Sequence, residues 1–309
     1  MSWLDRQSFL GINSDQVLRD AVIGVAGLGG GGSHVVQQLA HLGVGHFVVL
    51  DHDAIDDTNL NRLIGGRHDD LPQGSRPGTN KAEIARRMIV GINPSAKIYA
   101  HSAFWQVEAD RLKVCDLIVG GLDSVRAKAE LEAFSRRFLI PYLDMGMDVH
   151  ALDAGYLIAG QVALSMPGCP CLRCMGIIRQ EALDDEGRNY GAAGGKPQVV
   201  WPNGVLASTA VGLAVQILSP WLPNPISSTY LEYDGNLHTI KESKRFARIK
   251  NLPCPHYPSN ETGDPGFDVR KAMATPAPAD QPLVVTSPVP SWWRRFLGWL
   301  GIGPSERTE

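Results

Sequence analysis

Residues 21–63 decide the fold of this chain and read AVIGVAGLGGGGSHVVQQLAHLGVGHFVVLDHDAIDDTNLNRL. The continuous apolar run over residues 21–26 predicts a strand that is buried on both faces. Apolar residues recur at helical spacing over residues 33–42, and Ser33 is suited to cap that helix. A second apolar run over residues 46–50 predicts a second strand. Strand, helix and strand in this order are typical of a βαβ unit in a parallel sheet.

A glycine cluster joins the first predicted strand to the helix. It holds the pattern Gly27-x-Gly29-x-x-Gly32, with Gly30 also in the turn. Glycine permits positive φ and lets the backbone approach a ligand closely, and the helix that follows directs its free N–H groups at a phosphate. Asp51, at the carboxyl end of the second strand, can accept hydrogen bonds from ribose hydroxyls. Together these features predict a nucleotide site.

Three polar side chains past the second predicted strand favour a triphosphate over a dinucleotide cofactor. They are Asp53, Asn59 and Arg62, and a cation near the phosphate edge suits a triphosphate. Residues 25–63 closely resemble the ThiF/MoeB/HesA family of ATP-dependent activating enzymes, which are relatives of the ubiquitin-activating enzymes. The resemblance extends over nearly all of the predicted folded part, from about residue 6 to about residue 256.

The remaining pattern predicts an α/β, Rossmann-like mixed sheet wrapped by helices, parallel in its N-terminal half and antiparallel in its C-terminal half. Further strands are expected over residues 97–100, 114–119, 138–145, 155–165 and 228–242, the last with a hairpin turn at Asp234-Gly235. Helices are expected over residues 81–90, 125–138 and 204–218.

Three charged residues complete the predicted nucleotide site. Lys81 opens a predicted helix, and the resemblance implies that it contacts the ATP phosphates. Asp123 follows a predicted central strand; its residue type suits a helix N-cap, and the resemblance implies an Mg²⁺ ligand. Arg6 stands where related enzymes carry an arginine that reaches the ATP of the neighbouring subunit, which implies a homodimer. A solvated surface role for Arg6 stays open.

The cysteines suit a metal better than a disulfide framework, because three of the five lie close together. Cys171 and Cys174 form a CxxC, and Cys254 follows about 80 residues later, a spacing that indicates a structural Zn²⁺ clamp. The resemblance implies a zinc held by four cysteines, but this chain has no cysteine at the fourth position. His256 is the predicted substitute, Cys169 is the alternative ligand, and a site that has lost its metal is the further alternative.

The chain lacks the usual nucleophile of thioester-forming relatives. Such relatives carry a cysteine just before the helix that corresponds to residues 204–218, and Val200 occupies this position here. We therefore expect no thioester at the usual place. Ser208 and Thr209 could in principle form an oxyester, but helix hydroxyls usually bond to backbone and no activating base is apparent.

The resemblance implies a reaction in which ATP activates a carboxylate, with ATP and Mg²⁺ as cofactors. The C-terminal carboxylate of a ubiquitin-like or sulfur-carrier protein ending in Gly-Gly would attack the α-phosphate and release pyrophosphate. This tail would pass under residues 181–203, which are expected to form a glycine-bearing loop. Alternatives are a tRNA-modifying dehydratase of the same superfamily, an NAD-dependent dehydrogenase and a non-catalytic carrier-binding scaffold.

Composition sets the broad class. A net charge of −3 without a long basic block gives no electrostatic case for nucleic acid, and no secretory signal or membrane-spanning apolar run is evident, so we expect a cytoplasmic protein. Residues 1–258 are predicted to form a ThiF-type ATP-binding adenylation domain, and residues 259–290 a Pro/Ala-rich linker. Residues 291–303 form a Trp-rich amphipathic segment that could dock on the enzyme itself, recruit a conjugating or sulfurtransferase partner, or lie on a membrane.

Overall fold

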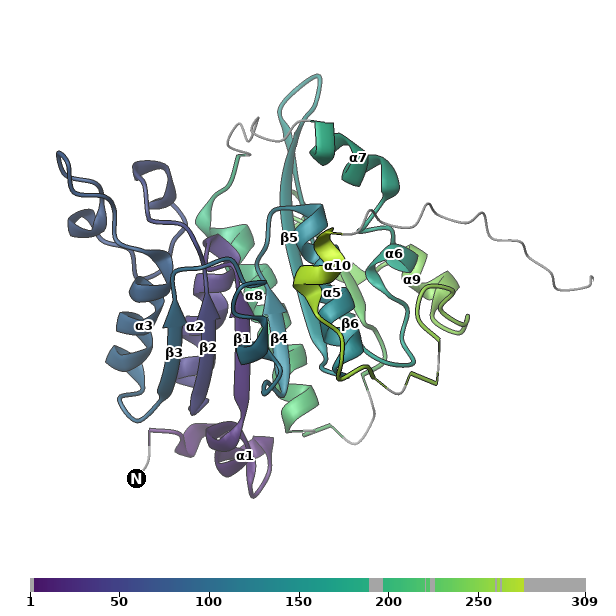
Figure 1. Cartoon of the computed structure of the whole chain (residues 1–309), viewed down its shortest axis with the longest axis horizontal. Helices are drawn as coiled ribbons and strands as arrows, with labels where there is room; N and C mark the ends of the chain where they lie inside the picture. The colour runs from purple at the N-terminus through teal and green to yellow at the C-terminus, as the bar shows by residue number, and fades with distance from the viewer. Residues whose placement is uncertain are drawn as a thin grey trace, which may run out of the picture. The chain divides into compact units, whose positions relative to one another are not determined.

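An eight-stranded mixed sheet runs through the centre of the structure, a computed structural model in which residues 3–188, 197–219, 221–222, 226–258, 260–261 and 263–274 are described (Figure 1). The strands are β1 (Val22–Ala26), β2 (His46–Leu50), β3 (Lys97–His101), β4 (Leu117–Gly120), β5 (Tyr142–Ala151), β6 (Tyr156–Ser165), β7 (Tyr230–Asp234) and β8 (Thr239–Glu242). Their order across the sheet is β3-β2-β1-β4-β5-β6-β7-β8. Neighbours from β3 to β5 are parallel and neighbours from β5 to β8 are antiparallel, which confirms the predicted mixed sheet.

Helices cover both faces of the sheet. The α-helices are α1 (Ser14–Asp20), α2 (Gly30–His41), α3 (Lys81–Ile92), α4 (Ala109–Leu112), α5 (Val125–Arg137), α6 (Leu172–Met175), α7 (Gln180–Arg188), α8 (Val200–Leu218), α9 (Lys244–Ile249) and α10 (Val269–Ala274). Short 3₁₀ helices are η1 (Asp5–Leu10), η2 (Asp57–Asn59) and η3 (His68–Asp70).

Strand alternation divides most of the buried side chains into two large cores, one on each face of the sheet. Val25 of β1 and the side chains on the same face of the sheet pack against α2, α3 and α8. Ala26 and the side chains on the opposite face pack against α4, α5 and α6. Helix α8 is long and apolar enough to cross a membrane by length and composition. It packs against α2, β5 and β6 with Leu206 and Ala210 buried, so its composition is explained by a place in the core.

Helix α2 begins earlier than the sequence indicated. Ser33 does not cap it: the helix starts at Gly30, and the Ser33 hydroxyl donates to the Gly30 carbonyl (3.1 Å) inside the first turn. The same oxygen accepts the N–H of Ile64 (3.1 Å), which ties the loop after β2 to the helix. Glycines therefore fill the first turn of α2, a place where helix propensity alone disfavours them.

Two other local expectations were wrong. Ser124, and not Asp123, caps α5, because the Ser124 hydroxyl accepts the N–H of Ala127 (3.1 Å). Residues 181–203 are not simply a loop: α7 occupies residues 180–188 and the first turn of α8 occupies residues 200–203. Acidic residues at helical spacing in α7 are the signal that the glycine content of this stretch obscured.

The compact unit continues to Met273, past residue 259, where the sequence placed the start of a linker. Val269 at the start of α10 is 2 % exposed and belongs to the core on the α5 side, with Phe267 packed against it. The rest of the expected linker, from residue 275, and the Trp-rich segment 291–303 lie outside the described residues.

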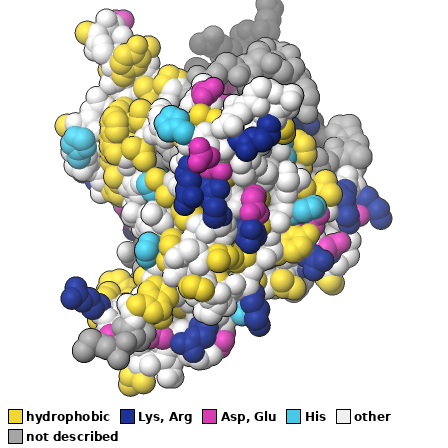
Figure 2. All heavy atoms as spheres, turned by 90° about the vertical axis from the view of Figure 1, so that its left-hand side faces the viewer, with side chains coloured by type: hydrophobic (Ala, Val, Ile, Leu, Met, Phe, Trp, Pro, Cys, Tyr) yellow, Lys and Arg dark blue, Asp and Glu magenta, His cyan; other side chains and the backbone are white. Residues whose placement is uncertain are grey.

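The face that carries the edge strand β3 mixes basic and acidic side chains (Figure 2). Two arginines of α3 are paired: Arg86 lies 2.6 Å from Glu83, and Arg87 lies 2.6 Å from the buried carboxylate of Asp70. The Arg87 hydrogen bond holds the pKa of Asp70 below its usual value. Because Asp70 also accepts the N–H of Arg67 (2.9 Å), this pair holds the loop that leads into α3.

Candidate nucleotide site and candidate metal centre

The carboxyl ends of three parallel strands meet at one edge of the sheet. Ala26 at the end of β1 pairs in register with Leu50 of β2 and with Gly120 of β4. The residues that follow these strands are therefore neighbours, and they include the glycine turn, Asp51 and the segment that leads to Asp123. Ligands of open parallel sheets bind at this edge, where connections on the two sides of the first strand diverge.

Backbone contacts explain two glycines of the turn, Gly27 and Gly32. Gly27 has φ +86°, and a Cβ there would lie 2.6 Å from the carbonyl oxygen of Gly121. A Cβ on Gly32 would lie 1.9 Å from the carbonyl oxygen of Gly27. Gly29 differs, because a Cβ there would meet no atom within 4 Å. The open side of the turn therefore lies at Gly29, the N-cap of α2, where no described side chain caps the helix.

Asp51 ties the glycine turn to the end of β2. Its carboxylate is 7 % exposed and accepts the N–H groups of Leu28 (2.6 Å) and Asp53 (2.8 Å). Burial raises the pKa of Asp51, and the positive charge of Lys81 partly offsets this rise. Asp51 thus orders the edge of the site, and a contact with ribose would add to this role.

Lys81 is held at the same edge as predicted from its position in the first turn of α3. Its ammonium lies 2.8 Å from the Asp53 carboxylate. Asn80 caps the helix by accepting the N–H of Ala82 (2.8 Å), and its amide donates to the Asp53 carbonyl (2.8 Å) and to the Ser102 hydroxyl (2.7 Å). The helix cap therefore fixes the backbone of Lys81, and the Asp53 carboxylate holds its ammonium. The Asp53 carboxylate is half-exposed, so a phosphate could take its place beside the ammonium.

The loop after β2 carries the other two predicted residues. Asn59 is 7 % exposed, and its amide donates to the Asp56 carboxylate (2.8 Å), while its own buried oxygen has no protein partner in the described structure. Arg62 donates to the Thr58 carbonyl and to the side chain of Asn61 (3.0 Å). In this structure the guanidinium of Arg62 binds its own loop, so a phosphate contact requires it to rotate.

Helix α7 contributes a carboxylate beside Asp123. Glu186 accepts the N–H groups of Val125 (2.7 Å) and Arg126 (3.0 Å) and the hydroxyl of Ser124 (3.1 Å). Asp123 itself is exposed, directly before this occupied helix end. No local pattern predicts Glu186 there, since the contact joins segments about sixty residues apart.

Arg6 is not brought to the nucleotide edge of its own chain. It lies exposed in η1, and its neighbour Gln7 donates to the carbonyl of Leu42 (3.1 Å), which precedes β2. Figure 1 shows η1 and α1 below the amino ends of the strands, at the end of the sheet opposite the glycine turn. A contact between Arg6 and a nucleotide would therefore need a second copy of the chain.

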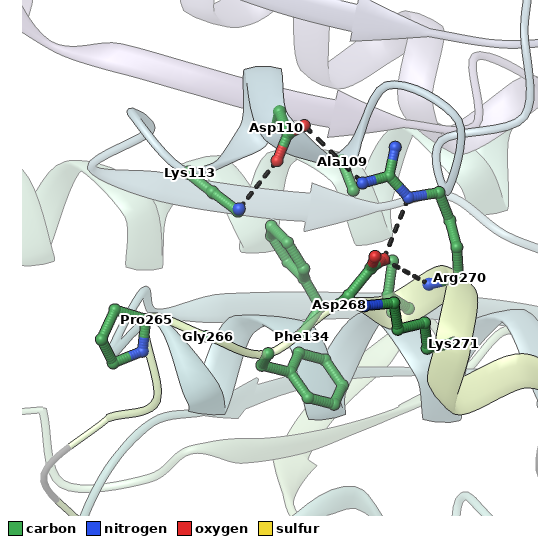
Figure 3. A pocket seen from close by; sticks show the side chains of 11 residues that line it. Ala109, Asp110, Lys113, Phe134, Pro265, Gly266, Asp268, Arg270 and Lys271 are labelled. Atoms are coloured by element: carbon green, nitrogen blue, oxygen red, sulfur yellow. Dashed lines mark hydrogen bonds and ion pairs between the residues drawn. The ribbon is translucent and has the colours of Figure 1, made fainter.

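A surface pocket lies elsewhere, between α4, α5 and α10 (Figure 3). Its charged groups pair with each other: Lys113 lies 2.7 Å from Asp110, and Arg270 lies 3.0 Å from Asp268. Neither the glycine turn nor the residues around Lys81 line it. We therefore assign the candidate site to the carboxyl edge of the sheet and not to this pocket.

Four side chains gather into a candidate metal centre. The sulfur of Cys174 lies 3.6 Å from that of Cys171 and 3.7 Å from that of Cys254. Nδ1 of His256 lies 3.4 Å from the Cys171 sulfur and 3.5 Å from the Cys174 sulfur. All four ligand atoms lie within 4.8 Å of one another. His256 is thus the fourth member, and Cys169 is not part of this cluster.

This spacing fits a tetrahedral ion. Bonds of about 2.3 Å to sulfur and about 2.0 Å to nitrogen place tetrahedral ligand atoms about 3.5–3.8 Å apart. Hydrogen bonds from the other two thiols lower the pKa of Cys254, so the cluster already favours a thiolate at that position. Three sulfur donors and one imidazole are a donor set that zinc takes in structural sites.

The sequence matches the family model described as the ThiF family over residues 4–255. This chain belongs to the ThiF family. It is 34% identical over 134 residues to the tRNA threonylcarbamoyladenosine dehydratase of Escherichia coli, a match that covers 42% of this chain and 48% of that protein. It is 30% identical over 152 residues to the SAMP-activating enzyme E1 of Haloferax volcanii, which covers 49% and 52% of the two chains.

Solved structures show the same fold. E. coli MccB, solved with ATP, superposes on this ThiF-family chain with a TM-score of 0.62 at 19% identity, covering 79% of this chain and 71% of MccB. At this identity the likeness concerns the fold alone. The chain spans about half the length of the curated relatives above, so their activities are carried over only as proposals.

Two features of this ThiF-family site escaped sequence reasoning. Asn80 both caps α3 and orients the segment that holds Lys81, and an asparagine directly before a helix is a signal that could have been used. Asn203, 6 % exposed at the start of α8, lies where a Cβ on Gly30 would be only 2.6 Å from its side-chain nitrogen. Only the fold brings this asparagine to the glycine turn.

Proposed function

We propose that this chain adenylates the C-terminal glycine carboxylate of a ubiquitin-like or sulfur-carrier protein and releases pyrophosphate. The observation that carries the proposal is the Lys81–Asp53 pair beside the open glycine turn, because it puts a cation and free helix N–H groups at one edge. Membership of the ThiF family supports an ATP-dependent activating enzyme.

The proposed step is a displacement at phosphorus. An oxygen of the substrate carboxylate forms a bond to the α-phosphorus of ATP, and the bond from that phosphorus to pyrophosphate breaks. Lys81, and Arg62 after rotating away from its loop, would offset phosphate charge, while Asp51 would hold the ribose. Mg²⁺ held by Asp123 would supply further neutralisation of the phosphates. The protein contributes placement and charge, and no covalent intermediate on its own side chains is needed.

We propose that a homodimer completes the site. Around Arg6 the η1 region exposes three large apolar side chains, since Trp3 is 57 % exposed, Phe9 69 % exposed and Ile12 fully exposed. A second copy that covers these groups would also lie next to Arg6. Arg6 could then reach the nucleotide edge of that second copy, which it does not reach in its own chain. Exposed apolar clusters of this kind are typical of association surfaces.

A thioester step is not part of the proposal. Val200, in the first turn of α8, occupies the place of the usual cysteine. The thiols that the chain does have are that of Cys115, which is buried with its pKa raised to about 12, and those in or beside the metal clamp. The hydroxyl of Thr209 donates to the Val205 carbonyl (2.9 Å), which leaves Ser208 as the exposed hydroxyl of this helix turn. The activated carboxylate would therefore pass to an external acceptor.

The similarity to the tRNA dehydratase supports one alternative function. Activation of the threonylcarbamoyl carboxylate of a modified tRNA would use the same nucleotide edge. The two candidates differ in what must reach this edge: a thin peptide end for a carrier protein, and a nucleoside for tRNA. The net charge of −3 favours the protein substrate, because tRNA binding draws on clustered basic side chains.

ATP–pyrophosphate exchange tests both candidates. The purified chain is assayed with small Gly-Gly-ending carrier proteins, with the same carriers lacking the final glycine, and with tRNA carrying threonylcarbamoyladenosine. We expect exchange only with an intact carrier, and no thiol-sensitive adduct by mass spectrometry. Exchange that depends on tRNA alone would replace the proposal by the dehydratase, and a lasting thioester would contradict the direct-transfer step.

We further propose that the Cys171, Cys174, Cys254 and His256 clamp holds zinc with a structural role. Removing zinc with a chelator is expected to lower the melting temperature by several degrees, because a ligand at 100 times its Kd stabilises the folded state by about 2.7 kcal/mol. Pyrophosphate exchange below the new melting temperature should persist, since α6 and α9 lie away from β1 and β2 (Figure 1). Cys254→Ser should reproduce the change, and a melting curve insensitive to both treatments would refute a structural metal.

A further inference from the structure

Helix α5 buries two opposite charges in its second half. Glu132 is 1 % exposed and Arg136 is 2 % exposed. The hydroxyl of Ser165, at the end of β6, links them: it donates to Glu132 (2.6 Å) and accepts from Nε of Arg136 (3.0 Å). Taking ions out of water costs several kcal/mol each, so such a pair persists only where many hydrogen bonds compensate it.

Both side chains contact the half of the clamp that holds Cys171 and Cys174. Glu132 accepts the N–H of Leu172 (2.7 Å), the residue directly after Cys171. Arg136 donates from Nη2 to the carbonyl of Cys169 (2.9 Å). The backbone on either side of Cys171 is therefore anchored to one helix by two hydrogen bonds, and the one from the guanidinium of Arg136 is charge-assisted, the stronger class of such bonds.

Arg136 also reaches the other half of the clamp. Its guanidinium lies 5.0 Å from the ring centre of Tyr257, the neighbour of His256, and 3.3 Å from the buried carboxylate of Glu261. The Tyr257 N–H in turn donates to the sulfur of Cys254 (3.4 Å). Segments that lie about eighty residues apart in the sequence thus meet on Arg136, and the hydroxyl of Ser165 joins Glu132 to it.

We propose that Glu132 and Arg136 are positioning residues of the metal centre, which hold its two halves at ligand spacing before an ion binds. Neither side chain is a ligand, and neither belongs to the nucleotide edge. Their effect is on affinity: with the backbone anchored, less ordering remains to be done when the ion binds. This inference rests on the clamp geometry and is independent of the adenylation reaction.

Zinc affinity of the full-length protein tests the inference. Glu132→Leu removes the acceptor of the Leu172 N–H at similar volume, and Ser165→Ala removes the link with a smaller perturbation. Each variant is titrated with a zinc-binding dye as competitor, and its Co²⁺ form is examined for the absorption bands of a tetrahedral thiolate site. We expect affinity to fall about 10–100-fold, the usual effect of losing a supporting hydrogen bond. Glu132→Gln keeps an acceptor oxygen and should stay within a few-fold of the wild type.

Glu130→Leu is the matched control, because Glu130 lies on the same helix but accepts from Gln106 (2.9 Å). It should leave zinc affinity unchanged. Wild-type affinity in both Glu132→Leu and Ser165→Ala would overturn the proposal, as would an equal loss in Glu130→Leu. If Glu132→Leu fails to fold, Ser165→Ala and Glu132→Gln decide the question. Carrier-dependent pyrophosphate exchange is measured separately, so its absence leaves this result intact.

Discussion

Lys81→Ala is expected to lower ATP–pyrophosphate exchange by about 10²–10³-fold while leaving the fold intact. A donor aimed at developing charge in a water-poor site contributes about this much to catalysis. Lys81 is 11 % exposed along its side chain and sits on the first turn of α3, so its ammonium is placed by the helix and by Asp53. Removing it leaves the phosphate charge without this counter-charge.

The matched control is Lys97→Ala, which removes a lysine at the amino end of β3, the other end of the sheet. Melting curves of both variants should match the wild type, because neither side chain contributes to the buried core. Nucleotide binding, followed by calorimetry, should weaken less than exchange does if Lys81 acts mainly on the transition state. Exchange within three-fold of the wild type in Lys81→Ala would remove the central element of the proposed function.

The arrangement of the candidate nucleotide edge could be predicted because its signals are local. The glycine pattern, the apolar strand before it and Asp51 after the second strand lie within a short stretch, and parallel strands bring such ends together whatever the rest of the fold. Lys81 was predictable for a related reason, since a helix start after a loop places the first turn at this edge. The antiparallel half of the sheet was indicated by the hairpin-turn signal at Asp234-Gly235, which lies at the turn between β7 and β8.

The remaining features depend on contacts between distant segments. Glu186 accepts the first N–H groups of α5 from about sixty residues away in the sequence, and Asn203 meets the glycine turn from α8. The choice of His256 over Cys169 also needed the fold, because both lie near a cysteine in the sequence. Arg136 donates a hydrogen bond to the carbonyl of Cys169 and so fixes the backbone of this loop. In the loop as it is held, the sulfur that faces Cys174 is that of Cys171 and not that of Cys169.

The start of α2 shows how tertiary packing overrides local preference. Sequence patterns placed the cap at Ser33, yet the helix begins at Gly30, and its first turn passes close to the backbone of Gly27 in the turn after β1. A serine cap signal cannot report this approach. The glycines that weaken a helix in isolation are here the residues that allow it to begin.

Gly32→Ala is therefore expected to destabilise the protein by at least about 3 kcal/mol, toward the upper end of the cost of forcing an extra carbon into a packed site. Its Cβ would lie 1.9 Å from the carbonyl oxygen of Gly27, and a backbone atom cannot turn aside as a long side chain can. The gain in helix propensity from glycine to alanine is about 1 kcal/mol and does not offset this clash. Thermal and urea unfolding measure the outcome.

Gly29→Ala separates packing from ligand approach at the same turn. A Cβ there meets no protein atom within 4 Å, and the backbone has φ −66°, which any residue adopts. Its stability should match the wild type, whereas ATP affinity should fall if phosphate binds against this open side of α2. A Gly32→Ala protein as stable as the wild type would show that the turn can shift, and a Gly29→Ala protein with unchanged ATP affinity would place the phosphates elsewhere. The pair of variants thus tests whether one glycine serves the fold and the other serves the nucleotide.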